Sequence, residues 1–152
     1  MSAILFVCTG NLCRSPMAAA LLRQRLAAEG LEDSYRIISA GVWAVNGKPA
    51  SENAIAVMAE RGLDISDHVA HTLTTEDVAE ADLILVIAQE HAQLIGHTWP
   101  QYRWKVHRLS EMAGKRQDIA DPYGCSIEEY RACADMIARY IDQGFRRIIE
   151  LA

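Results

Sequence analysis

The segment "VCTGNLCRSP" concentrates residue types that can perform chemistry. Cys8, Cys13, Arg14 and Ser15 occur within eight positions. A cysteine thiolate is a strong nucleophile, and the planar guanidinium of arginine can bind two oxygens of a tetrahedral anion. A loop that wraps both side chains around one phosphoryl group can transfer that group to sulfur. The spacing therefore predicts a phosphate-binding loop over residues 8–15, with Cys8 beneath the phosphorus atom, Arg14 at its side and Ser15 hydrogen-bonded to the sulfur.

A strand and a helix must flank this 8–15 loop. Residues 3–7 form a continuous apolar run with branched side chains, which is typical of a strand buried on both faces. Pro16 suits the first turn of a helix, and residues 17–30 are strong helix formers that end at a glycine. A loop between such elements collects unpaired backbone N–H groups at the positive end of the helix dipole. Gly10 is expected to let these groups turn inward, where they also favour the thiolate of Cys8.

The rest of the chain alternates between strand and helix patterns. Further strands are expected at 35–41, 82–88 and 104–109, and further helices at 51–62, 74–81, 90–96 and 127–148. Ser51 has the residue type of a helix N-cap. The alternation predicts a three-layer α/β sandwich, in which helices cover both faces of a parallel sheet. Sites in such folds lie at the carboxyl ends of the strands, where the 8–15 loop is expected.

Composition and charge narrow the functional classes. A chain of 152 residues is long enough for one domain, which we expect to span residues 1–152. The net charge of −5 argues against a nucleic-acid binder, which usually has a basic stripe. The longest apolar run, residues 81–88, is too short to cross a membrane, and the first residues lack the features of a secretory signal. A cytoplasmic protein is therefore expected.

Other chemistries fit the 8–15 loop less well. A nucleotide-binding loop of the Walker type would require a Gly-Lys-Ser or Gly-Lys-Thr sequence, which is missing. Zinc binding by Cys8 and Cys13 would need two more ligands, and Cys125 and Cys133 lie on or near a helix without a metal-binding pattern. The spacing between Cys8 and Cys13 also differs from that of the usual redox pair. A purely structural turn gives no reason for glycine, cysteine and arginine to coincide, so we expect no metal and no cofactor.

The sequence "VCTGNLCRSPMAAALL" resembles the signature of the low-molecular-weight protein tyrosine phosphatases, in the bacterial branch close to the phosphoarginine phosphatases. The resemblance continues through "ISAG", "ISDHVAHTLT", "ADLILVIA" and "DPYG". It implies a flavodoxin-like, four-stranded parallel sheet. It also implies a metal-independent phosphatase that works in two steps through a cysteinyl-phosphate intermediate.

The resemblance also implies a general acid. Displacement by Cys8 requires a proton for the leaving oxygen, and the 8–15 loop contains no acid. Asp118 and Asp121 both lie in "DIADPYGCS", and the Asp-Pro pair of the family falls on Asp121 and Pro122. We therefore expect Asp121 to protonate the leaving group and then to deprotonate the attacking water.

Aromatic side chains are expected to form the walls of the substrate pocket. Tyr123 suits one wall for an aromatic ring, and Trp43, after the second strand, is a candidate for the opposite wall. Trp43 is almost equally well explained as a partly buried aromatic residue. Many eukaryotic relatives have a second aromatic residue directly after the position of Tyr123, where this chain has Gly124, and this difference predicts a more open groove.

The resemblance assigns supporting roles around the loop. It places a polar network beneath the loop and assigns Cys13 as a redox guard, which would trap oxidised Cys8 as a disulfide. Outside the network, His71 occupies a position that is usually arginine in the family, and we assign it no role. The phosphate-binding residues are expected to be Thr9, Gly10, Asn11, Leu12, Cys13 and Ser15, and the network Asn11, Ser15, Ser39 and His68.

Three functional classes remain to be separated. The first is a phosphatase acting on phosphorylated proteins or peptides, with inorganic phosphate or other oxyanions binding at the same site. Within this class, phosphoarginine enzymes usually have threonine at the position of Leu12, so leucine favours phosphotyrosine over phosphoarginine. Arsenate reduction would need two further cysteines after the third strand, and "IAQEHAQLIGH" has none. A non-catalytic phosphopeptide-binding module would be expected to have lost Cys8, Arg14 or Asp121.

Overall fold

A four-stranded parallel sheet forms the centre of the protein. The computed structural model describes residues 1–152, and its strands occur in the order β2-β1-β3-β4. The strands are β1 (Ser2–Cys8), β2 (Tyr35–Gly41), β3 (Leu83–Val86) and β4 (Val106–Arg108). The predicted flavodoxin-like, four-stranded parallel sheet is confirmed.

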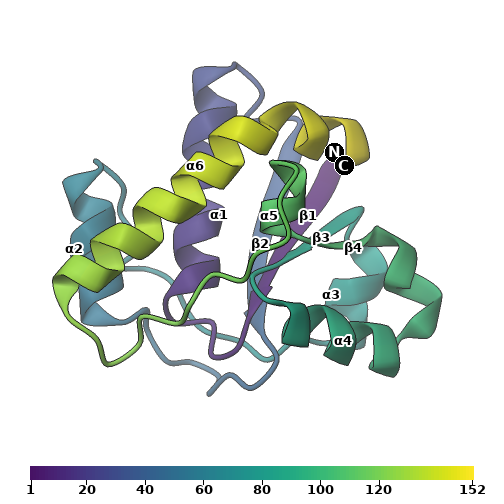
Figure 1. Ribbon diagram of the computed structural model, residues 1–152, viewed down its shortest axis with the longest axis horizontal. Helices are drawn as coiled ribbons and strands as arrows, with labels where there is room; N and C mark the ends of the chain where they lie inside the picture. The colour runs from purple at the N-terminus through teal and green to yellow at the C-terminus, as the bar shows by residue number, and fades with distance from the viewer.

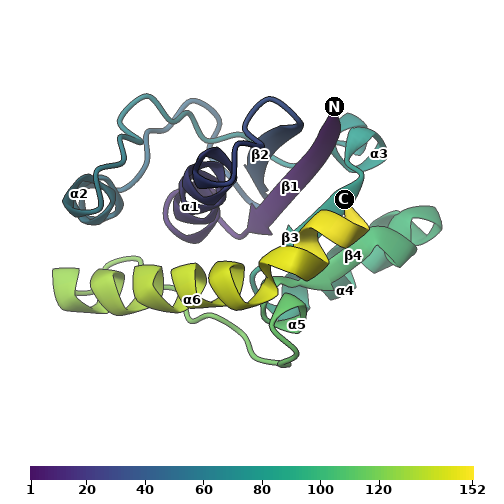
Figure 2. The same cartoon turned by 90° about the horizontal axis from the view of Figure 1, so that it is seen from above.

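Helices cover both faces of this sheet, as Figures 1 and 2 show. One face is covered by α1 (Arg14–Ala28), α2 (Glu52–Glu60), α5 (Leu109–Met112) and α6 (Ile127–Leu151). The other is covered by α3 (Thr75–Glu80), α4 (Gln89–Thr98) and the short 3-10 helix η1 (Pro100–Lys105). The three-layer sandwich is therefore confirmed, and it leaves the carboxyl ends of the strands as the edge where loops can form a site.

The alternation of side chains along β1 builds two hydrophobic cores. Ile4 and Phe6 belong to the larger core, beneath α1, α2 and α6, while Leu5 and Val7 belong to the smaller core on the α3 and α4 side. All four side chains are fully buried. A strand buried on both faces reads as a continuous apolar run, which is why the sequence pattern identified it.

The long helix α6 packs its apolar stripe along the larger core. Its first turn is capped by Ser126, whose hydroxyl accepts a hydrogen bond from the backbone N–H of Glu129 at 3.3 Å. Near its other end, a Cβ atom added at Gly144 would lie 2.5 Å from the Cβ atom of Met112 in α5. Glycine at this position therefore permits the close approach of the two helices.

Several local features differ from the sequence expectations. Ser51 does precede α2, but its hydroxyl makes no capping hydrogen bond and instead contacts Cys13. The last strand is only three residues long, and the short helices η1 and α5 have no periodic pattern long enough to be recognised. None of the helices has the length and apolar character needed to cross a membrane.

Candidate active site

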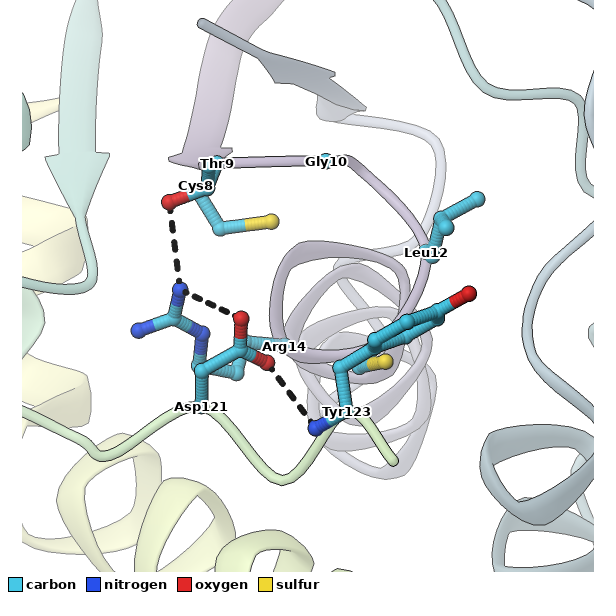
Figure 3. A pocket seen from close by; sticks show the side chains of 8 residues that line it. Cys8, Thr9, Gly10, Leu12, Arg14, Asp121 and Tyr123 are labelled. Carbon is cyan, nitrogen blue, oxygen red and sulfur yellow. Dashed lines mark hydrogen bonds and ion pairs between the residues drawn. The ribbon is translucent and has the colours of Figure 1, made fainter. Parts of the chain in front are cut away.

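The 8–15 loop connects the carboxyl end of β1 to the amino end of α1. Cys8 is the last residue of β1 and pairs with Gly41 of β2, and α1 begins at Arg14. The loop forms the floor of a cavity of about 200 Å³, which is shown in Figure 3. The cavity is lined by Cys8, Thr9, Gly10, Leu12, Cys13, Arg14, Asp121 and Tyr123. The structure thus brings together the thiol, the guanidinium and the carboxylate that the sequence predicted at the site.

The sulfur of Cys8 is held by a buried hydroxyl group. The Sγ atom of Cys8 lies 2.9 Å from the Oγ atom of Ser15, and both residues are buried. Ser15 lies in the first turn of α1, where the unpaired N–H groups of a helix also favour negative charge. This environment suits a cysteine that acts as a thiolate.

Asn11 shapes the loop through its backbone and its side chain. Its φ angle of 57° places it in the left-handed region, which asparagine tolerates better than most residues. Its side-chain amide donates to the Oγ atom of Ser15 at 2.8 Å and to the Oγ atom of Ser39 at 3.0 Å. Its Oδ1 atom accepts from the backbone N–H of His71 at 3.1 Å. The fully buried side chain of Asn11 therefore has an acceptor for each of its two N–H bonds and a donor for its oxygen.

His68 supports the same loop from outside. Its Nε2 atom lies 2.7 Å from the backbone oxygen of Asn11, and because a carbonyl oxygen only accepts, Nε2 must be the donor. Burial lowers the pKa of His68, so this ring is neutral at neutral pH. The predicted network of Asn11, Ser15, Ser39 and His68 is brought together in the structure. The left-handed residue of the loop is Asn11, and Gly10 has no positive φ angle.

Arg14 is fixed in place by groups on separate segments. Its Nη1 atom donates to the backbone oxygen of Ile119 at 2.8 Å, and its Nη2 atom donates to the Oγ1 atom of Thr9 at 3.4 Å. The same Nη2 atom lies 3.6 Å from a carboxylate oxygen of Asp121. These interactions, drawn in part in Figure 3, hold the buried guanidinium at the cavity wall.

The two candidate acids have different surroundings. Asp121 has a half-exposed side chain that lines the cavity, and its other oxygen accepts from the backbone N–H of Tyr123 at 3.1 Å. Asp118 instead accepts from the backbone N–H of Gln89 at 2.9 Å and from Arg108 at 3.1 Å. The bond from the Gln89 backbone, followed by that from Arg108, lowers the pKa of Asp118. Asp118 therefore anchors the segment that carries both acids to Gln89 and Arg108, and Asp121 is the carboxylate that lines the cavity.

The apolar part of the cavity wall consists of Leu12 and Tyr123. Figure 3 shows both side chains on the side away from the guanidinium of Arg14. Trp43 is not part of this wall, and its side chain is 81% exposed. The backbone N–H of Trp43 donates to the oxygen of Thr9 at 2.9 Å, so the residue contacts the loop through its backbone while its ring remains in solvent.

Comparison with known proteins identifies the family. The family model described as low molecular weight phosphotyrosine protein phosphatase matches residues 3–150. The chain belongs to this family. Members hydrolyse phosphate monoesters through a cysteine nucleophile and without a metal ion.

Individual relatives of this family cover nearly the whole chain. A probable low molecular weight protein-tyrosine-phosphatase EpsP of Ralstonia nicotianae is 45% identical over 145 residues, which cover 95% of this chain and 94% of the relative. A protein-arginine-phosphatase of Bacillus subtilis is 39% identical over 141 residues, or 92% of each chain. The crystal structure of a low molecular weight protein tyrosine phosphatase from T. tengcongensis has a TM-score of 0.91 and 39% identity, covering 97% of this chain and 99% of that one.

The second cysteine of the family signature, Cys13, is buried and lies close to two hydroxyl groups. The Sγ atom of Cys13 lies 3.2 Å from the Oγ atom of Ser51 and 3.3 Å from the hydroxyl oxygen of Tyr130. Burial raises the pKa of the Cys13 thiol above its ordinary value, and it also raises that of the nearby Cys133, to about 12. Cys13 is therefore a neutral thiol at neutral pH, although it lines the same cavity as Cys8.

Sequence reasoning missed two residues at the site of this phosphatase. A Cβ atom added at Gly41 would lie 2.6 Å from the backbone oxygen of Thr9 and 2.8 Å from the backbone nitrogen of Asn11. The glycine that ends "ISAG" was the available signal for this close approach. His91 is the second, since its Nε2 atom lies 2.9 Å from the Oγ1 atom of Thr9. A histidine in the first turn of a helix gives no such signal in the sequence.

Proposed function

We propose that this protein hydrolyses phosphotyrosine in proteins or peptides, with residues 1–152 acting as one catalytic domain. The observation that carries the proposal is that Cys8, Arg14 and Asp121 line one cavity, which also has an apolar wall with Leu12 and Tyr123. The first three groups suit a phosphoryl group, and the apolar wall suits the ring to which it is attached.

In the first step, Cys8 is the nucleophile. Phosphoryl oxygens bind to the guanidinium of Arg14. There they compete with the Asp121 carboxylate, which lies 3.6 Å from the Nη2 atom of Arg14 in the structure. The sulfur of Cys8 forms a bond to phosphorus as the bond between phosphorus and the phenolic oxygen breaks. Asp121, in its protonated form, gives its proton to that oxygen. The products of this step are the free tyrosine hydroxyl and a cysteinyl-phosphate.

In the second step, water releases the phosphate. Asp121, now a carboxylate, takes a proton from water, and the water oxygen bonds to phosphorus as the bond between sulfur and phosphorus breaks. The electron pair of that bond returns to Cys8. Ser15, at 2.9 Å from the sulfur, stabilises the departing thiolate. Inorganic phosphate is therefore the second product and a ligand of the resting site.

A second candidate substrate is phosphoarginine. It is favoured by the 39% identity to the protein-arginine-phosphatase of Bacillus subtilis. Its guanidinium carries several N–H donors, which would need polar partners in the pocket. Leu12 offers none in the cavity wall, and for this reason we place phosphotyrosine first.

Rate measurements with chelator present test this function. We expect the purified protein to hydrolyse an aryl phosphate, and Cys8→Ser to abolish turnover while the folded variant still binds inorganic phosphate. Turnover by Cys8→Ser at the wild-type rate would exclude the mechanism. Asp121→Asn should slow poor leaving groups more than good ones, because only poor ones depend on the donated proton. Equal slowing would point to another acid.

Substrate class requires a direct comparison. Matched peptides that carry phosphotyrosine or phosphoarginine should be hydrolysed side by side at the same concentrations. Faster hydrolysis of the phosphotyrosine peptide is expected. Faster hydrolysis of the phosphoarginine peptide would reverse the order of the two substrates while leaving the roles of Cys8 and Arg14 intact.

A further inference from the structure

The side chain of His91, in α4, contacts the 8–15 loop. It is the third residue of α4, which follows β3 after a short connection, and it is only 1% exposed. Its ring nitrogens both have close partners, the backbone N–H of Ala88 at 3.2 Å from Nδ1 and the Oγ1 atom of Thr9 at 2.9 Å from Nε2. A longer approach of 3.8 Å separates Nε2 from the Glu90 carboxylate.

The contacts of His91 determine which nitrogen carries the hydrogen. The backbone N–H of Ala88 can only donate, so Nδ1 must be an unprotonated acceptor. The hydrogen of the neutral ring therefore lies on Nε2, which donates to Thr9. Burial, and then the charge of Arg14, lowers the pKa of His91 to about 4, in agreement with a neutral ring.

Thr9 connects this histidine to the phosphate-binding arginine. The Oγ1 atom of Thr9 accepts from Nε2 of His91 at 2.9 Å and from Nη2 of Arg14 at 3.4 Å. Both lone pairs of the hydroxyl oxygen are therefore engaged, which fixes the oxygen between the two donors. The other end of the guanidinium is held by the backbone oxygen of Ile119. The guanidinium thus has two hydrogen-bond acceptors besides the Asp121 carboxylate, and His91 orients one of them.

We infer that His91 is a positioning residue, which holds the Thr9 hydroxyl so that Arg14 faces a bound phosphoryl group. It acts as a neutral hydrogen-bond donor, is not in the cavity wall and does not touch the reacting atoms. The inference rests on the proposed phosphatase function for its kinetic consequences. The affinity of the site for inorganic phosphate reports the position of Arg14 even without turnover.

Two conservative substitutions separate the two bonds of His91. In His91→Asn, the carbonyl oxygen takes the place of Nδ1 and keeps the bond to the Ala88 N–H, but nothing reaches Thr9. In His91→Gln, the amide nitrogen takes the place of Nε2 and keeps the bond to Thr9. We expect kcat/KM and the affinity for inorganic phosphate to fall about tenfold in His91→Asn and to stay within about threefold of wild type in His91→Gln.

Thermal unfolding of both variants separates positioning from folding. A merely structural role would make the loss of phosphate affinity follow the loss of thermal stability, whichever bond is kept. A positioning role predicts instead that phosphate affinity is lost in the variant without the bond to Thr9 and kept in the variant that retains it. Equal phosphate affinity in His91→Asn and His91→Gln would overturn the inference.

A double-mutant cycle tests whether His91 acts through Thr9. Thr9→Val keeps the shape of the side chain and removes the hydroxyl. In that background, His91→Asn should cost little further phosphate affinity, because the connection is already broken. If His91→Asn lowered phosphate affinity by the same factor in the Thr9→Val background as in wild type, the inference would be overturned. A wild-type protein that binds no phosphate would also overturn it. A wild type that binds phosphate but hydrolyses no aryl phosphate would instead contradict the proposed function.

Discussion

The hydroxyl of Ser15 is directed at the sulfur of Cys8 by Asn11. The Nδ2 group of Asn11 can only donate, and it lies 2.8 Å from the Oγ atom of Ser15. The serine oxygen therefore accepts this bond, and its own hydrogen is free for the sulfur at 2.9 Å. A thiolate is an acceptor, so the chain from Asn11 through Ser15 to Cys8 is matched to the charged form of the cysteine.

Removal of this hydroxyl should slow catalysis. A hydrogen bond to a charged group contributes about 1.5–3 kcal/mol, so Ser15→Ala is expected to lower kcat by about 10- to 150-fold. Hydrolysis of the cysteinyl-phosphate should be slowed most, because the thiolate is the leaving group in that step. Single-turnover kinetics with an aryl phosphate that has a good leaving group would measure the two steps separately.

Ser39→Ala is the matched control for this prediction. Ser39 also accepts from the Asn11 amide, at 3.0 Å, but it makes no bond to the sulfur. Its removal should therefore cost less activity than that of Ser15. Equal losses of kcat in the two variants would show that the hydroxyl acts through loop shape and not through the thiolate.

Gly41 is expected to be essential for the shape of the 8–15 loop. The Cβ atom of Gly41→Ala would overlap backbone atoms of Thr9 and Asn11, and backbone atoms cannot turn aside as the end of a side chain can. The loop must shift, so we expect the affinity for inorganic phosphate and kcat/KM to fall at least about a hundredfold, in line with the sensitivity of catalysis to a displacement of 1 Å. Calorimetric titration with phosphate would measure the change.

The control for Gly41 is a glycine far from the site. Gly62 has a φ angle of 76°, and an added Cβ atom there would have no neighbour within 4 Å. Gly62→Ala should lower the free energy of unfolding by about 1 kcal/mol through backbone strain and leave phosphate affinity unchanged. Normal phosphate binding by Gly41→Ala would contradict the close-packing argument.

The features that were predictable from the sequence are those with local signals. The apolar run of β1 and the periodicity of α6 follow from burial patterns within each element. Ser51 was identified by residue type alone, and its hydroxyl turned out to contact Cys13, 38 positions away. The roles of Gly41 and His91 likewise depend on contacts with another segment. No pattern within a single element records such a contact, which is why these residues emerged only from the fold.

Leu12 is expected to control the choice of substrate. In Leu12→Thr, an apolar contact with the tyrosine ring is replaced by a hydroxyl that can accept from a guanidinium. The kcat/KM for a phosphotyrosine peptide should fall about tenfold, the usual effect of a small change in an apolar pocket. The kcat/KM for a phosphoarginine peptide should rise. Leu12→Val, which stays apolar, is the control and should preserve the preference. Parallel changes for both peptides in Leu12→Thr would show that this residue does not select the substrate.

His91 should make folding stability depend on pH in the weakly acidic range. Its pKa is about 4 in the folded protein, against an ordinary value of about 6.5 in an unfolded chain. The charged groups that bear on it are Arg14, Asp118, Asp121 and Glu90, and burial outweighs the three carboxylates. Between these two pH values the unfolded chain binds more protons, so the contribution of His91 is complete above pH 6.5 and is lost as the pH falls toward 4.

This contribution can be isolated by comparison with a variant that does not titrate. The loss amounts to about 3 kcal/mol across this range, at about 1.4 kcal/mol per pH unit. Urea unfolding at pH 7.5, 5.5 and 4.5 should show wild type losing stability faster than His91→Gln, because glutamine carries no charge at any of these values. The other titrating groups, including His68, are common to both proteins and cancel in the difference. Parallel loss of stability in the two proteins would mean that His91 binds protons equally well in the folded and the unfolded chain, and would contradict the lowered pKa of its buried ring.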